Sequence, residues 1–237
     1  MCFSWPVGWG CCGFFIGLCI ISKVRQFWAC GGGLRAINTT ISARTLSIKG
    51  FVQLMTGCPK IKRGEKIYLA NDFITPDNLI IQKLAESIRK GCKTKKDCIL
   101  KAFNFVSTKI RYISDKRLHG LPEYWQFPEE TLRYGAGDCE DSSFLLASIL
   151  LALGFPKDDV RVALGAYEGA GHAWVEVKDG GVWYLLESTS DEFCYDWCFD
   201  EIGYAYKAGY EPELYVYKHI CIAVGRKGIY DRYPLYY

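Results

Sequence analysis

Apolar residues recur at helical spacing through the middle of the chain and then gather into strand-like runs. A first helix is predicted over residues 75–91, because Thr75 suits the N-cap, Pro76 the first turn and Gly91 the end. Its apolar stripe is formed by Leu79, Ile80, Leu84 and Ile88. A second helix is predicted over residues 96–107, and the residues that it buries are Ile99, Phe103 and Val106.

Residues 138–153 are predicted to form a third helix that has almost no polar face. Apolar side chains fill nearly every position from Phe144 to Leu153, and Gly154 and Pro156 then end the helix. A helix that is apolar on all sides lies in the middle of a core. A short strand over residues 110–113 and a loop with Gly120, Pro122 and Pro128 precede it.

Strand-like runs follow this helix at residues 160–167, 172–178, 182–187 and 215–224. Helices that come first and strands that come afterwards indicate an α+β fold. The buried helix is therefore predicted to pack on an antiparallel sheet.

The start of the chain differs in composition from the rest, which divides it into residues 1–54 and a globular domain over residues 55–237. Residues 2–21 are almost wholly apolar and uncharged, and their length suits a membrane span. Lys23 and Arg25 follow, so insertion would leave the domain on the cytoplasmic side. Several glycines argue against insertion, and the second methionine, Met55, leaves residues 1–54 open as a dispensable extension. A cytoplasmic or membrane-tethered domain is expected.

Composition excludes several classes of protein. Half of the 237 residues are hydrophobic and 15% are aromatic, unlike a disordered or fibrous chain. The formal net charge is +3 and no strand interleaves basic with aromatic residues, so no nucleic acid partner is expected. With three histidines and no pair of CxxC elements, neither a metal nor a cofactor is predicted.

Twelve cysteines are present, and their pairing is open. Cys194 with Cys198, or Cys92 with Cys98, would form disulfides in an oxidising compartment. Free buried thiols that act as small hydrophobic side chains are the alternative.

Cys139 differs from the other cysteines because it lies at the start of the buried helix. Asp138 is a good N-cap, and Asp141 occupies the position from which a capping partner returns to it. The free N–H groups and the helix dipole favour a thiolate in the first turn, and a thiolate is the competent nucleophile. The carboxylates of Asp138, Glu140 and Asp141 oppose this, so a neighbouring imidazolium is needed.

A predicted hairpin supplies the imidazole. If Asp179-Gly180 forms the turn, His172 lies across from Glu187, with Cβ atoms about 5 Å apart on one face of the sheet. A turn at Gly180-Gly181 would instead pair His172 with Thr189. The first register predicts a nucleophile, a base and a residue that orients the base.

Three stretches resemble motifs of the transglutaminase-like superfamily of cysteine enzymes. Gly137 to Ser143 (GDCEDSS) is similar to its nucleophile motif, Gly171 to Glu176 (GHAWVE) to its histidine motif, and Trp183 to Thr189 (WYLLEST) to its third motif. Phe127 to Leu132 resembles the approach to the nucleophile, and the likeness covers about residues 75–190. The resemblance implies a papain-like core, no metal for catalysis in most members, and the triad Cys139, His172 and Glu187. The third residue is commonly aspartate in this family, and Asp191 is the alternative orienting residue.

The resemblance implies an enzyme that cleaves a peptide, isopeptide or side-chain amide bond through a thioester. Transfer of the acyl group to an amine, as in transglutaminases, and a non-catalytic binding module on the same fold are the alternatives. The substrate is expected to be a protein or peptide. The oxyanion would be bound by the backbone N–H of Cys139 and one further donor, with Trp125 and Gln126 as weak candidates. The aromatic stretch 191–217 would line a groove or cover the sheet edge.

Overall fold

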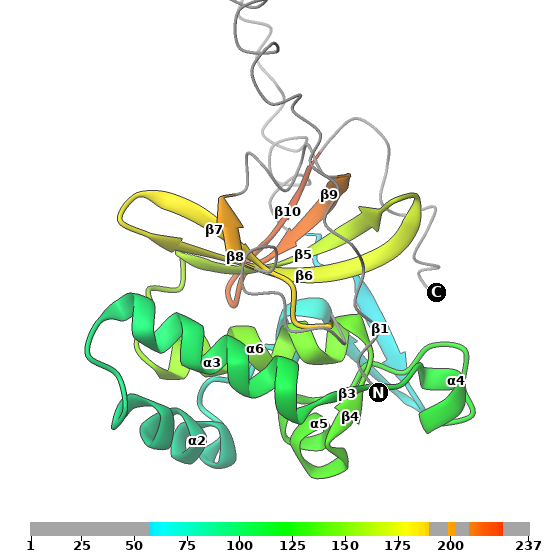
Figure 1. The fold of residues 1–237 in the computed structure, drawn as a ribbon. Coiled ribbons are helices and arrows are strands. Elements are labelled where there is room, and N and C mark those ends of the chain that lie inside the picture. The colour runs from blue at the N-terminus through cyan, green and yellow to red at the C-terminus, as the bar shows by residue number, and fades with distance from the viewer. Residues whose placement is uncertain (1–56, 190–198, 202–208, 225–237) are drawn as a thin grey trace, which may run out of the picture. The chain divides into compact units, whose positions relative to one another are not determined.

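The computed structural model describes residues 57–189, 199–201 and 209–224, which form an α+β fold as predicted. Its main sheet has six strands, all antiparallel to their neighbours, in the order β10-β9-β5-β6-β7-β8. Figure 1 shows the helices gathered on one face of this sheet. The strands of the sheet are β5 (Val160–Tyr167), β6 (Ala170–Asp179), β7 (Val182–Leu186), β8 (Phe199–Glu201), β9 (Tyr210–Val216) and β10 (Cys221–Ala223).

Helix α6 (Cys139–Ala152) is the centre of the described core, as its apolar sequence predicts. Every residue from Glu140 to Leu150 is buried. The helix packs on β5 and β6 with one side and on α2 (Leu79–Arg89), α3 (Lys95–Lys109) and α5 (Pro128–Tyr134) with the other. A helix enclosed in this way has little freedom to move, so a group at its first residue has a fixed position.

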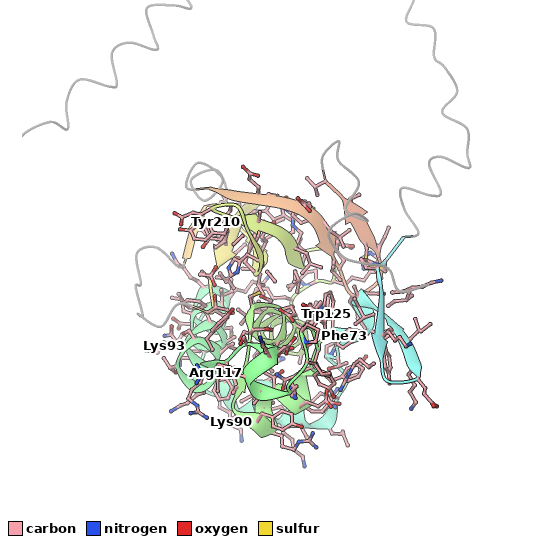
Figure 2. All side chains as sticks on the ribbon, turned by 90° about the vertical axis from the view of Figure 1, so that its right-hand side faces the viewer. Phe73, Lys90, Lys93, Arg117, Trp125 and Tyr210 are labelled. Carbon is pink, nitrogen blue, oxygen red and sulfur yellow. A yellow bond between two sulfur atoms is a disulfide. The ribbon has the colours of Figure 1, made fainter. Side chains whose placement is uncertain are left out.

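An aromatic cluster fixes the loop that leads into α5. Phe73 belongs to the short helix η1 (Ala70–Phe73), and its ring centroid lies 5.4 Å from that of Trp125 and 4.7 Å from that of Phe127. Trp125 also contacts Phe144 of α6, at 5.2 Å between centroids. Figure 2 shows Phe73 and Trp125 side by side in the core. The loop before α5 is therefore anchored on both sides.

The short strand predicted over residues 110–113 is present as β3 (Arg111–Tyr112), which pairs in parallel with β4 (Ala136–Gly137). Other short elements around this core were not predicted by the hydrophobic pattern. They are β4, the hairpin of β1 (Lys60–Arg63) and β2 (Lys66–Leu69), and helix α4 (Asp115–Leu118). The pairing of β3 with β4 places Tyr112 beside Gly137, two residues before Cys139.

Two sequence predictions need correction. Helix α2 begins at Leu79, because Asn78 rather than Thr75 caps it and accepts a hydrogen bond from the N–H of Ile80. Leu79 and Ile80 consequently lie on its exposed side. The single strand predicted over residues 215–224 is the hairpin of β9 and β10.

A disulfide joins Cys58 to Cys221 across 163 residues and connects the start of the described domain to β10. Cys92 and Cys98, which the sequence offered as a pair, are free thiols. Cys194 and Cys198 lie outside the described residues.

Loss of the Cys58–Cys221 bridge is expected to lower the free energy of unfolding by about 2–4 kcal/mol, because it restrains a long loop in the unfolded chain. Denaturant unfolding of Cys58→Ser measures this difference. Cys92→Ser, which removes a thiol that is not bridged, is the matched control. Equal stability of Cys58→Ser and wild type would contradict the prediction.

No helix among the described residues is long and apolar enough to cross a membrane. The apolar segment 2–21 lies outside the described part, and its role as an anchor stays a prediction.

Candidate active site

Cys139 is the first residue of α6, with Asp138 as its N-cap. The backbone N–H of Asp138 donates to Oδ2 of Asp141 at 3.3 Å, so Asp141 returns to the cap as predicted. The thiol of Cys139 donates to Oε2 of Glu140 at 3.4 Å, and the backbone N–H of Ala173 is close enough to the sulfur to lower the pKa of the thiol. The sulfur therefore lies against β6, beside the residue that follows His172.

Burial raises the pKa of the Cys139 thiol, and the carboxylates of Glu140 and Asp138 raise it further. The N–H of Ala173 acts in the opposite direction. The neighbouring acidic residues thus oppose formation of a thiolate at Cys139, as expected from the sequence. The start of the helix alone does not ionise this thiol.

His172 lies near the start of β6, and its Nε2 is 2.6 Å from Oε2 of Glu187. Burial alone would raise the pKa of Glu187, but hydrogen bonds from His172 and Thr189 hold it below its ordinary value. The carboxylate is therefore ionised and fixes one ring nitrogen, which leaves Nδ1 for a reacting group. Within the described residues, the Cys139 thiol and the His172 ring share no hydrogen bond.

The structure brings His172 and Glu187 together through a register other than the one predicted. Asp179 pairs with Val182, so the turn is Gly180-Gly181 rather than Asp179-Gly180. Both turn residues have positive φ, 59° and 87°, which glycine adopts without a steric penalty. If this register is extended by one residue past Leu186, Glu187 lies across from Trp174. The side chain of Glu187 therefore reaches His172 diagonally.

Trp125 and Gln126, the weak oxyanion candidates, have their side-chain donors engaged elsewhere. The indole N–H of Trp125 donates to Glu123 at 2.6 Å. The amide of Gln126, which is fully buried, donates to the backbone oxygen of Ala136 at 3.2 Å and to Asp141. In this structure neither side chain keeps a free N–H for an oxyanion, so the two residues stay a prediction for that role. Both side chains fix the loop before α5.

Asp115, Asp138 and Glu140 form an acidic cluster around Cys139 that sequence reasoning missed. One oxygen from each lies within 4.8 Å of the others. Oδ1 of Asp115, Oδ1 of Asp138 and Oε1 of Glu140 are buried and have no hydrogen-bond partner among the described residues. Asp115 is only 3% exposed and Glu140 only 7%. Asp138 and Glu140 flank Cys139 in sequence, but no local signal marks Asp115. The pairing of β3 with β4 brings Asp115 close to them.

These three carboxylates suit a hard divalent cation. Calcium binds oxygen at about 2.3–2.6 Å, so oxygens within 4.8 Å of one another can all reach one ion. Burial and the charge of Asp138 raise the pKa of Asp115 to about 7 and raise that of Glu140 well above its ordinary value. Burial and the proximity of the three carboxylates thus both disfavour their ionised forms.

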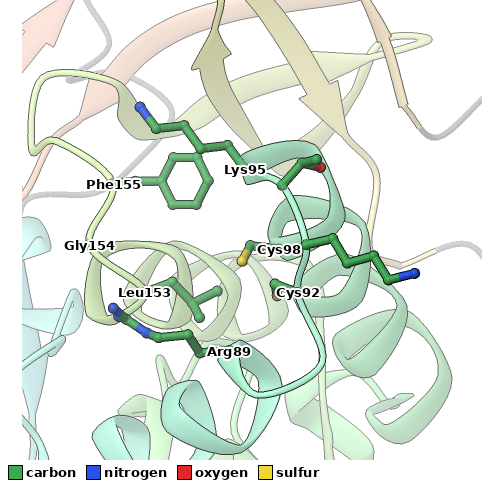
Figure 3. Close-up of a pocket in the computed structure, with 9 residues that line it drawn as sticks. Arg89, Cys92, Lys95, Cys98, Leu153, Gly154 and Phe155 are labelled. Atoms are coloured by element: carbon green, nitrogen blue, oxygen red, sulfur yellow. The ribbon is translucent and has the colours of Figure 1, made fainter.

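A surface pocket of about 260 Å³ lies away from Cys139, between the end of α2, the start of α3 and the residues after α6. Cys92 and Cys98 both line it, together with basic side chains and Phe155 (Figure 3). Burial and a hydrogen bond with Cys92 raise the pKa of Cys98 to about 11, so this thiol is not an activated nucleophile.

Asp191 and most of the aromatic stretch 191–217 lie outside the described residues. Tyr210 is described, and its ring contacts that of Trp174 with 5.1 Å between centroids.

Residues 82–188 match the family model described as the transglutaminase-like superfamily. Among solved structures, LapG from Legionella pneumophila aligns at 20% identity over 64% of this chain and 89% of its own, with a TM-score of 0.48. Its calcium-bound form aligns at 18% identity over 63% and 88%, with a TM-score of 0.41. A structure titled as a TGase aligns at 16% identity over 63% and 35%, with a TM-score of 0.37. No curated protein matches the chain.

Proposed function

Because residues 82–188 belong to the transglutaminase-like superfamily, we propose that this protein is a cysteine-dependent enzyme that hydrolyses a peptide, isopeptide or side-chain amide bond. One observation carries the proposal. Cys139 is the first residue of a buried helix, its pKa is lowered by the backbone N–H of Ala173, and the residue before Ala173 is a histidine whose Nε2 is hydrogen-bonded to Glu187. This arrangement supports a nucleophile, a base and an orienting carboxylate.

The reaction proceeds through a thioester. His172 takes the proton of the Cys139 thiol, and the sulfur attacks the carbonyl carbon of the substrate. The tetrahedral intermediate collapses with cleavage of the C–N bond, and the departing amine takes the proton from His172. Water then attacks the thioester with His172 again as base, which releases a carboxylic acid and restores the thiol. The backbone N–H of Cys139 at the start of α6 is a donor for the oxyanion.

A divalent cation, best represented by calcium, belongs to the same proposal. Asp115, Asp138 and Glu140 would hold it through the oxygens that have no other partner among the described residues. When bound, the cation supplies positive charge beside the nucleophile. The carboxylates that flank Cys139 would then be neutralised, and the residues from Asp138 to Asp141 would be held more firmly.

Transfer of the acyl group to an amine remains the alternative reaction, because the thioester is common to both outcomes. A non-catalytic module is disfavoured, since a scaffold has no need of a histidine bonded to a buried carboxylate beside a thiol.

Cleavage of a peptide library by wild type and by Cys139→Ala tests the proposal. We expect cleavage by wild type and a loss of at least a thousandfold in Cys139→Ala, because the variant has no nucleophile. Cys92→Ser, which changes a thiol in the distant pocket, should cleave at the wild-type rate. An amine donor added to the reaction separates the two outcomes, since transfer yields conjugates that mass spectrometry detects. Retained cleavage by Cys139→Ala would refute the assignment of the nucleophile.

A further inference from the structure

The carboxylate of Glu187 receives four hydrogen bonds in the described structure. Nε2 of His172 lies 2.6 Å from Oε2, and the hydroxyl of Tyr210 donates to the same oxygen at 3.0 Å. Thr189 donates twice to Oε1, from its backbone N–H at 3.0 Å and from its hydroxyl at 2.5 Å. Two carboxylate oxygens offer about four lone-pair sites, so this buried group is fully satisfied.

The register of the hairpin explains why the carboxylate needs this support. Glu187 is across from Trp174 and must reach His172 diagonally, so its side chain spans more than the distance to a directly opposite residue. Glutamate has one carbon–carbon bond, roughly 1.5 Å, more than aspartate, and one more rotatable bond. The longer side chain gives the reach, but its carboxylate is oriented only if other groups hold it.

Tyr210 is itself held firmly. Its ring stacks on that of Tyr167, with 4.4 Å between centroids, and meets the edge of Trp174 at 5.1 Å. Tyr210 comes from β9, two strands away from β6 in the sheet, and Figure 2 shows it on the sheet side of the molecule. The hydroxyl therefore reaches Glu187 from an element independent of the hairpin that carries the histidine.

We propose that Tyr210, with Thr189, is a positioning residue that orients the glutamate of this site toward His172. This inference rests on the proposed function, since it assigns a role in the same reaction. Tyr210 acts on the reaction through its hydrogen bond to Glu187. It allows a glutamate to serve where the family commonly has the shorter aspartate.

Tyr210→Phe is the test, because it removes the hydroxyl and keeps the stacked ring. For the peptide that wild type cleaves fastest, kcat should fall at least about tenfold with KM unchanged, the loss expected for one hydrogen bond to a charged group. In a Glu187→Ala background the same change should have no further effect, because Tyr210 then has no carboxylate to orient. Tyr167→Phe, which removes the hydroxyl of the neighbouring stacked ring, is the matched control and should behave as wild type.

A second readout does not depend on cleavage. It is the NMR signal of the Nε2–H proton of His172, measured in the Cys139→Ala variant. The signal is assigned by its absence when His172→Ala is added. Tyr210→Phe should move this resonance downfield, because the His172 bond no longer shares Oε2 with a second donor, and Tyr167→Phe should leave it in place. The proposal would be overturned if Tyr210→Phe lowered kcat equally in the wild-type and Glu187→Ala proteins, or if it left the His172 resonance in place. A moved resonance in a protein that cleaves nothing would refute the proposed function and leave the Tyr210 contact supported.

Discussion

Calcium added to the metal-free protein is expected to raise its melting temperature by roughly 5–10 °C. A ligand at a hundred times its Kd stabilises the folded state by about 2.7 kcal/mol, and each kcal/mol corresponds to about 2–4 °C for a domain of this size. The physical reason is the acidic cluster, in which one oxygen of each of Asp115, Asp138 and Glu140 lies within 4.8 Å of the others. Each of these side chains also has a buried oxygen without a hydrogen-bond partner among the described residues. Thermal unfolding after EGTA treatment, with and without millimolar calcium, measures the shift.

Asp115→Asn should remove most of this response, because it replaces one charged ligand and lies outside the catalytic motif. Glu129→Gln, which changes an acidic residue outside the acidic cluster, should respond to calcium as wild type does. An unchanged melting temperature of wild type at millimolar calcium would contradict the cation site. That result would leave Cys139 as nucleophile untouched, because the peptide-cleavage test decides it separately.

Asp141→Ala is expected to lower the free energy of unfolding by about 3–5 kcal/mol, a large share of the stability of a single domain. Asp141 is fully buried and accepts the backbone N–H of Gln126 at 2.7 Å, the side-chain amide of Gln126 and the N–H of Asp138 at 3.3 Å. Removing the carboxylate leaves these buried donors without a partner. Denaturant unfolding measures the loss.

Asp141→Asn is the control for this second prediction, since its carbonyl oxygen still accepts from Gln126. Burial raises the pKa of Asp141 to about 8, with the charge of Asp138 adding to the effect, so a neutral amide should be tolerated far better than alanine. A loss in Asp141→Asn equal to that in Asp141→Ala would show that charge, rather than hydrogen bonding to the loop, is what the position requires.

The sequence determined the α+β class, the buried helix and the residue at its start. These features depend on local patterns: a run of apolar side chains from Phe144 to Leu153 predicts burial, and Asp138 with Asp141 predicts a helix that begins at Cys139. The three motifs also predicted roles for His172 and Glu187, and in the structure the two side chains lie 2.6 Å apart.

The tertiary structure decided how these residues meet. The register depended on which two residues of Asp179-Gly180-Gly181 form the turn, and both choices suit a hairpin by sequence alone. In the observed register, the longer side chain of glutamate spans the diagonal from Glu187 to His172. Tyr210 had no signal along the chain, since its contact with Glu187 requires β9 and β6 to be placed by a shared neighbour, β5.

The same distinction applies to the acidic cluster and the disulfide. Asp138 and Glu140 are visible beside Cys139 in the sequence, but Asp115 joins them only because β3 pairs with β4, a contact of two residues that no periodicity predicts. Cys58 and Cys221 are 163 residues apart in sequence, and their disulfide depends on the position of β10 at the edge of the sheet. Local sequence thus determined which chemical groups this protein has, and long-range pairing decided which of them meet.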